Sequence, residues 1–452
     1  MAESGRSSGD APLTRQQRVW RWRVLTATYS AYVGYYLTRK VFTIAKSSIA
    51  TTFAWDLDRV AHLWTTFLVA YMVGQFVCSF VGRKWGPRVL LLAGLGLSML
   101  FNVIFGFTNS YATFLAFMLF NGLAQASGWP GAVGGVAHWL RRGERGFIMG
   151  LWSSNYLIGN ILVKSLGGLV LDAWGWRWSF WGCTLIAFGL WWLVWFWQRT
   201  SPADVGLEPI VASEEEEGDA VQGLQKEHIS AGEYFRIAMN PLILAMGVAY
   251  FCIKFLRYAL DSWLPTFLHL QGLGVGRASF YSQIFDIAGL VGLVVSGWAM
   301  DRLFRGRWER LCCLMGLGMV FGYLAVMWYG TNPYALAFCY GIVGFMLYGP
   351  DTLLCGAASV EAAGNLNAVA VAGIVDGLGS IGPVFQEEII GWLMGGTGKA
   401  GTQRGIHDVC LLTLGMSVAF VVCMAILTWY MSRAHRAAAE AGLADAAASS
   451  TP

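Results

Sequence analysis

The chain has 452 residues, of which 56% are hydrophobic and only 13% are charged, and its formal net charge is +4. Soluble domains carry about 25% charged residues, so this composition excludes an ordinary soluble enzyme and indicates a membrane protein. Most of the basic residues fall between apolar segments, so we expect no nucleic-acid partner. The nine cysteines lie in or beside apolar segments with no metal-binding spacing, so we expect no metal and no cofactor.

Residues 1–21 are predicted to form a polar N-terminal tail. They lack the apolar core of a cleavable signal peptide, so the first hydrophobic segment is expected to stay in the protein. The segments that follow are apolar and about long enough to cross a bilayer. The first six are residues 22–46, 62–82, 88–108, 112–137, 147–170 and 179–198. The second six are residues 241–269, 280–300, 309–329, 334–360, 366–394 and 409–431. The sequence therefore predicts an all-α membrane protein with twelve transmembrane helices.

A polar segment, residues 199–240, separates two predicted six-helix bundles, which cover residues 22–198 and 241–431. It contains the acidic run Glu214–Glu217 beside glycine and serine, a composition that cannot bury a core and predicts a solvated linker. Residues 432–452 form a C-terminal tail. Six spans, a linker and six spans are the layout of a two-halved secondary transporter.

The distribution of basic residues predicts the orientation, because cytoplasmic loops are rich in Lys and Arg. With the N-terminus in the cytoplasm, the opposite side receives only six of the 31 basic residues: Lys46, Arg59, Arg177, Arg277, Lys399 and Arg404. Both termini and the linker are therefore expected to be cytoplasmic. The excess of arginine over lysine and the alanine-rich tail favour a GC-rich genome and a bacterial inner membrane.

Five basic residues fall inside the predicted spans: Arg39, Lys40, Lys164, Lys254 and Arg257. A cation at the bilayer centre costs about 2.5 kcal/mol or more, and a shared aqueous cavity that holds an anion is the simplest reason for five. Arg39 and Arg257 lie in the spans that open the two halves, so pseudo-symmetry places them on opposite walls. Two guanidinium groups in that arrangement could bind one phosphate through paired hydrogen bonds.

Each of these cations also has a structural interpretation. Arg39, Lys40 and Lys164 could extend to the outer interface of the membrane. Arg257 could pair with Asp261, one helical turn further along the chain.

Other polar groups in the spans could contact the rest of a substrate. Lys254 lies three residues before Arg257 and can share its helix face. Hydroxyl groups for a sugar are offered by Tyr35, Tyr36, Tyr71, Tyr156 and Tyr258. Carboxylates that could balance the cations, contact sugar hydroxyls or carry a proton are Asp261, Asp286, Asp351, Asp376, Glu387 and Glu388. The predicted site comprises Arg39, Arg257, Lys254, Lys40, Tyr36, Tyr71, Tyr156, Tyr258, Asp351 and Asp376, with no catalytic group.

Short motifs occur in order along nearly the whole chain outside the termini and the linker. They include Tyr35-Tyr36-Leu37-Thr38-Arg39-Lys40, Gly128-Trp129-Pro130, Trp263-Leu264-Pro265-Thr266, Tyr348-Gly349-Pro350 and Asp376-Gly377-Leu378-Gly379. With these motifs the chain resembles the organophosphate:phosphate antiporters of the major facilitator superfamily. The resemblance implies that Arg39 and Arg257 are the phosphate-binding pair. It also implies that two rocking halves exchange a sugar phosphate for inorganic phosphate.

Two departures from that family bear on the substrate and a third bears on gating. Tyr156 stands where the glycerol-3-phosphate antiporters have a histidine, and Gln75 stands where they have a lysine. Both favour hexose 6-phosphate over glycerol 3-phosphate. Arg83 replaces the usual acidic residue of the first-half loop, so gating there is expected to differ.

Our first interpretation is a monomeric sugar-phosphate exchanger in the lipid bilayer. The sequence leaves two other functions open. A sensor of hexose phosphate that signals to a partner kinase would keep the same arginine pair. A proton-coupled symporter for another organic anion would use one of the intramembrane acids.

Overall fold

A computed structural model describes residues 13–140, 148, 152, 154–210, 235–236, 238–329, 332–355, 358, 368–395 and 398–449. The regular structure in these ranges is helical, and a helix occupies the described part of each predicted span. The prediction of an all-α fold is thereby confirmed. The acidic run Glu214–Glu217 lies outside the described residues, as do the side chains of Gln75 and Arg83.

The N-terminal half consists of α1 (Arg15–Phe53), α2 (Leu57–Phe107), α3 (Tyr111–Gln125), α4 (Gly128–Ala137), α6 (Asn155–Leu162), the π-helical turn η2 (Val163–Gly167), α7 (Gly168–Trp174) and α8 (Trp176–Trp197). Helix α1 starts at a capping box, in which Thr14 and Gln17 each satisfy the backbone N–H of the other. Helix α2 contains the predicted second and third spans. They meet at Gly86, whose φ of 77° favours glycine, immediately before Pro87.

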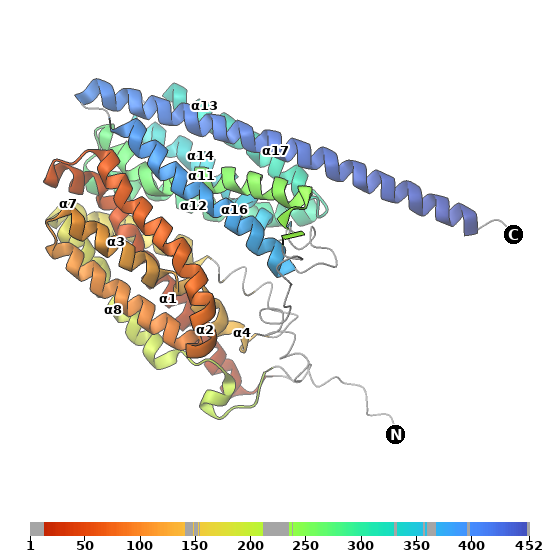
Figure 1. Ribbon diagram of the computed structural model, residues 1–452, viewed down its shortest axis with the longest axis horizontal. Helices are drawn as coiled ribbons and strands as arrows, with labels where there is room; N and C mark the ends of the chain where they lie inside the picture. The colour runs from red at the N-terminus through yellow and green to blue at the C-terminus, as the bar shows by residue number, and fades with distance from the viewer. Residues whose placement is uncertain are drawn as a thin grey trace.

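The C-terminal half consists of α11 (Pro241–Leu270), α12 (Val275–Arg302), α13 (Trp308–Tyr329), α14 (Pro333–Cys355), α16 (Ala368–Met394) and α17 (Gly398–Ser449). Asn240 caps α11 by accepting a hydrogen bond from the backbone N–H of Leu242 at 3.0 Å. Figure 1 shows the two halves as neighbouring groups of helices, with α17 continuing well past the others.

The halves touch at what we call the distal end, where α1 and α11 end and α2 and α12 begin. A Cβ atom added to Gly276 of α12 would lie 2.2 Å from Cβ of Asp172 in α7. One added to Gly391 of α16 would lie 2.4 Å from Cβ of Ala61 in α2. The helix backbones can approach this closely only because glycine has no side chain. The opposite end, where α1 and α11 begin, is called the linker end.

Eight described helical segments are long and apolar enough to cross a membrane by length and composition. The segments that contain Arg39, Lys40 and Lys46 or the break between α3 and α4 are not among them. Arg39, Lys40 and Lys46 are buried inside the protein rather than exposed on its surface.

Candidate functional site

Six cationic side chains are buried or nearly buried in the described helices: Arg39, Lys40, Lys46, Lys164, Lys254 and Arg257. Five of them are the intramembrane cations expected from the sequence. The sixth corrects an expectation, because Lys46 was predicted to lie on the outer side of the membrane. Helix α1 instead continues to Phe53, and Lys46 is fully buried against Glu387 of α16. Its charge suggested the end of a span, yet a buried partner balances it.

Arg39 is a cation with no carboxylate partner among the described residues. Its Nε donates a hydrogen bond to Oε1 of Gln125 at 3.2 Å, and Gln125 in turn donates to Thr38 Oγ1 at 2.8 Å. Cζ of Arg39 lies 4.4 Å from the ring centre of Tyr71 and 5.1 Å from that of Tyr36. Rings and one amide therefore hold the guanidinium group in place, while the hydrogen bond uses Nε and spares the two terminal nitrogens.

Arg257 faces a different environment in the C-terminal half. Its Nη1 donates to Oδ2 of Asp351 at 2.7 Å, so the alternative pairing with Asp261 is not observed. Arg257 Nε and Asp351 Oδ1 are buried without a hydrogen-bond partner in the described structure. Buried polar atoms are normally satisfied, so this single-contact pair has capacity for a further polar group.

Two tyrosine rings connect the arginines of the two halves. The ring of Tyr36 lies beside Arg39, and its centre is 6.2 Å from that of Tyr156. Tyr156 lies 4.8 Å from Cζ of Arg257, measured to the ring centre. The guanidinium groups thus belong to opposite halves and are connected through the two tyrosine rings.

Lys254 and Asp376 form a more accessible pair toward the linker end of the same half. Lys254 Nζ donates to Asp376 Oδ1 at 2.7 Å and to Ser380 Oγ at 2.9 Å. The Asp376 side chain is 50% exposed, whereas that of Lys254 is 10% exposed. The carboxylate therefore has lone pairs available to a ligand while it also balances the lysine.

The other lysines bind carboxylates across the boundary between the halves. Lys40 pairs with Asp261 of α11 and lies 5.3 Å from the ring centre of Tyr258. Lys164 Nζ lies 2.5 Å from Oδ2 of Asp286 in α12. Both lysines are buried, so neither extends to the membrane interface as the structural alternatives suggested.

Two expected polar contacts have other roles. The hydroxyl group of Tyr35 is buried and contacts Ser127 Oγ at 2.8 Å, which ties α1 to the break before α4. Glu388 is partly exposed and accepts from His62 Nδ1 at 2.7 Å at the distal end. Sequence reasoning missed Gln125 and Asn160 as well as Lys46, although Gln125 stands in the polar Asn-Gly-Leu-Ala-Gln stretch of a predicted span.

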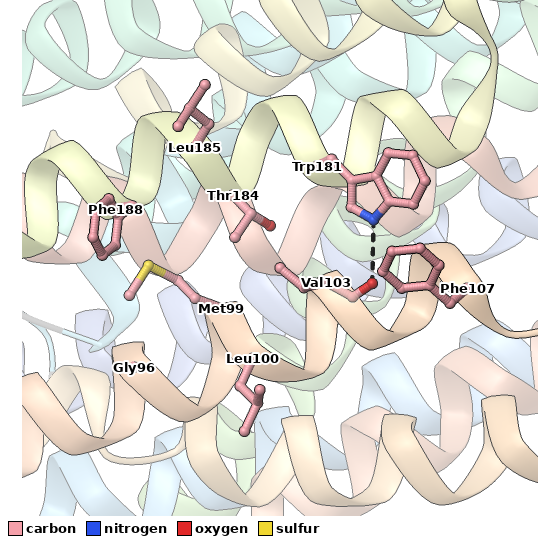
Figure 2. Close-up of a pocket in the computed structure, with 9 residues that line it drawn as sticks. All are labelled: Gly96, Met99, Leu100, Val103, Phe107, Trp181, Thr184, Leu185 and Phe188. Carbon is pink, nitrogen blue, oxygen red and sulfur yellow. Dashed lines mark hydrogen bonds between the residues drawn. The ribbon is translucent and has the colours of Figure 1, made fainter.

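An apolar pocket of about 530 Å³ lies on the outside of the N-terminal half, between α2 and α8 (Figure 2). Its polar side chains are already satisfied, because Trp181 Nε1 donates to the Val103 carbonyl at 3.2 Å and Thr184 Oγ1 to that of Phe180 at 2.7 Å. Without a charged group in its lining, this pocket is no candidate for an anion.

The family model described as Major Facilitator Superfamily matches residues 28–385. A probable hexose phosphate transport protein of Chlamydia pneumoniae is 27% identical over 365 residues, which cover 77% of the chain and 79% of the relative. The glycerol-3-phosphate transporter of Bacillus subtilis is 27% identical over 421 residues, covering 90% and 93%. The membrane sensor protein UhpC of Salmonella typhimurium is 25% identical over 415 residues, covering 90% and 91%.

Solved structures share the fold. A bacterial homolog of the human lysosomal transporter Spinster, in an inward-facing and unoccupied conformation, matches with a TM-score of 0.71 at 15% identity, over 92% of this chain and 97% of that one. The D-xylose-proton symporter matches with a TM-score of 0.66 at 15% identity, over 90% and 97%.

Proposed function

We propose, since the chain belongs to the Major Facilitator Superfamily, that it exchanges a sugar phosphate for inorganic phosphate by alternating access of its two halves. The chain is an integral multi-pass membrane protein and a transporter rather than an enzyme. The resemblance to organophosphate:phosphate antiporters is confirmed by its relatives, among them hexose phosphate and glycerol-3-phosphate transporters.

The observation that carries the proposal is the unbalanced charge of Arg39. The other five buried cations each bind a carboxylate, whereas Arg39 has none among the described residues. A buried charge without a partner is costly, and a phosphate dianion at this position removes that cost. The two terminal nitrogens of Arg39 match two phosphate oxygens in one plane.

Arg257 completes the proposed phosphate site from the other half. Asp351 occupies one of its terminal nitrogens and leaves Nε unsatisfied. Phosphate is therefore proposed to bind the free Nε and to displace Asp351 from Nη1, so that Asp351 orients Arg257 only while no substrate is present. An anion held by both arginines couples its own binding to the approach of the two halves.

The sugar part of the substrate is proposed to lie beside Lys254 and Asp376. Asp376 is the exposed member of that pair and can accept hydrogen bonds from hydroxyl groups. Tyr36 and Tyr71 lie beside Arg39, Tyr156 beside Arg257 and Tyr258 beside Lys40, so all four rings border the proposed phosphate site. Lys40 contributes positive charge while it is held by Asp261. Sugars and aromatic faces are compatible surfaces, so these rings suit a hexose ester.

We further propose a bacterial inner membrane, a monomer and cytoplasmic termini, the orientation that the Lys and Arg distribution favours. The linker end would then face the cytoplasm. The contacts between Gly276 and Asp172 and between Gly391 and Ala61 would close the protein on the outer side.

The test is exchange by purified protein in proteoliposomes loaded with inorganic phosphate. Labelled phosphate should leave when external hexose 6-phosphate is added and should stay when no counter-substrate is present. Exchange should persist when an ionophore collapses the proton gradient. Binding of hexose phosphate without exchange would favour a sensor, and loss of uptake with the proton gradient would favour a proton-coupled symporter.

A further inference from the structure

The described part of the fifth predicted span contains one π-helical turn, η2, and this turn contacts the other half of the protein. A π-helical turn adds a residue to a helix and is frequent at functional sites. Here the backbone carbonyl of Lys164 accepts a hydrogen bond from Ser279 Oγ of α12 at 2.9 Å. Ser165 Oγ donates to Gln283 Oε1 of the same helix at 2.5 Å. The turn thus directs two consecutive residues at α12.

Lys164 belongs to a chain of four buried charges at this boundary. Its Nζ lies 2.5 Å from Asp286 Oδ2 and 3.8 Å from Asp261 Oδ1, and the other Asp261 oxygen binds Lys40. Asn160 Nδ2 donates to Asp261 Oδ1 at 3.0 Å and to Asp286 Oδ1 at 3.3 Å. All four charged side chains are at most 3% exposed.

The charges are divided by sign between the two halves. Lys40 and Lys164 belong to the N-terminal half, whereas Asp261 and Asp286 belong to the C-terminal half. When the halves are in contact, the two cations cancel the two anions and the boundary is electrically neutral. When the halves separate, water can hydrate each charge again. The equal number of cations and anions therefore lowers the cost mainly of the step that closes the boundary.

We propose that Lys164 lets the two halves close without protonation of Asp286, because the Lys164 ammonium group is the cation that balances the Asp286 carboxylate. The inference rests on the proposed exchange function and deepens it: Lys164 is a positioning residue that makes exchange independent of protons. Without Lys164, closure would bury an unpaired carboxylate unless Asp286 first took up a proton.

Asp286 faces titratable or charged groups from every helix packed around it. They are Lys164 of η2, Lys40 of α1, Asp261 of α11, Tyr348 of α14, which donates to Asp286 Oδ1 at 3.3 Å, and Tyr156 of α6, whose ring stacks on that of Tyr348. Lys40 is already bound to Asp261, and the tyrosines are neutral near pH 7. Lys164 is therefore the cation that balances Asp286.

The decisive variants are Lys164→Met and Lys164→Met/Asp286→Asn, compared with Ser165→Ala as the control. Phosphate itself titrates in the working range, so each exchange rate is divided by the wild-type rate at the same pH. For Lys164→Met this ratio should rise about tenfold or more between about pH 8 and about pH 6. For the double variant it should be higher at pH 8 and flat, because no unpaired carboxylate is left. Ser165→Ala removes an uncharged contact of the same turn and should also give a flat ratio.

Thermal unfolding without substrate provides a second measurement that does not depend on transport. Folded Lys164→Met binds a proton that the unfolded chain releases, so its melting temperature relative to wild type should rise as the pH falls. Wild-type exchange in the same vesicles tests the proposed function separately. A flat ratio for a folded Lys164→Met protein, or a double variant no more active at pH 8 than the single one, overturns the inference. If Lys164→Met does not fold, the inference requires that Lys164→Met/Asp286→Asn does fold. A double variant that also fails to fold would overturn the inference.

Discussion

Lys46 of α1 and Glu387 of α16 form an ion pair that is fully buried between the two halves. Ser262 Oγ and Trp263 Nε1 of α11 donate to Glu387 at 3.0 and 2.9 Å, and the Lys46 ammonium lies 4.2 Å from the Trp263 ring centre. This pair joins the first helix of one half to the eleventh predicted span of the other near the distal end. Alternating access requires the halves to separate there, so the pair must break in each transport cycle.

We therefore expect Glu387→Gln to weaken distal closure. Removal of one partner from a buried ion pair costs about 3–5 kcal/mol, because the other charge is left uncompensated. A cysteine introduced near the distal contact, for example at Ala61, should react faster with a membrane-impermeant maleimide in this variant. Lys46→Met/Glu387→Gln should restore slow labelling, since both charges are gone. Equal labelling in the single variant and the wild type would contradict this role.

Arg39→Lys and Arg257→Lys should each reduce phosphate exchange about ten- to hundredfold. Lysine keeps the charge but loses the planar fork, and hydrogen bonds to charged groups are worth about 1.5–3 kcal/mol. Initial rates of labelled phosphate exchange in proteoliposomes provide the measurement. Arg59→Lys is the matched control, because Arg59 also lies over a tyrosine ring, that of Tyr111, but is exposed at the distal end. Near-normal exchange in either folded site variant would refute the phosphate site.

Asp351→Asn should increase the stabilisation of the protein by phosphate. In the wild type, Asp351 occupies Nη1 of Arg257, so an incoming phosphate competes with a carboxylate. The variant should melt at a lower temperature without ligand, because a buried arginine has lost its partner. It should then gain more on addition of saturating phosphate than the wild type does. The same phosphate-induced shift in both proteins would mean that Arg257 does not exchange Asp351 for the substrate.

Topology can be tested through the linker. Single cysteines placed at Glu214 or Glu216 should react with an impermeant reagent only after the cytoplasmic side is exposed, because the Lys and Arg distribution puts this segment there. Inverted and right-side-out vesicles allow the comparison. Labelling in intact cells would show that the linker lies outside the cell, so that the predicted orientation is wrong and the distal end faces the cytoplasm.

Hexose 6-phosphate should compete for phosphate exchange better than glycerol 3-phosphate. Tyr156 beside Arg257 supplies a hydroxyl group, and Asp376 presents a half-exposed carboxylate. Each added hydrogen bond to a sugar hydroxyl is worth about 1 kcal/mol, and two or three together change affinity by a factor of tens. Competition by both esters against labelled phosphate is the measurement. Equal or stronger competition by glycerol 3-phosphate would show that these residues do not select the larger substrate.

The sequence by itself determined the helical spans, the two halves and the unusual cations. Apolar length and the cost of a charge in a bilayer are properties of short segments, so Arg39 and Arg257 could be singled out without any knowledge of their neighbours. The ordered motifs also predicted the superfamily, which the family model confirms.

The tertiary structure alone decided how the charges pair. Lys40 and Asp261 are 221 residues apart in the chain, and Lys46 and Glu387 are 341 apart. No local pattern selects one of six intramembrane carboxylates for a given lysine. The nearest candidate for Arg257, Asp261 on its own helix, binds Lys40 and not Arg257. Partners are fixed by which helix faces meet when the two halves pack, and that packing left Arg39 without a carboxylate among the described residues.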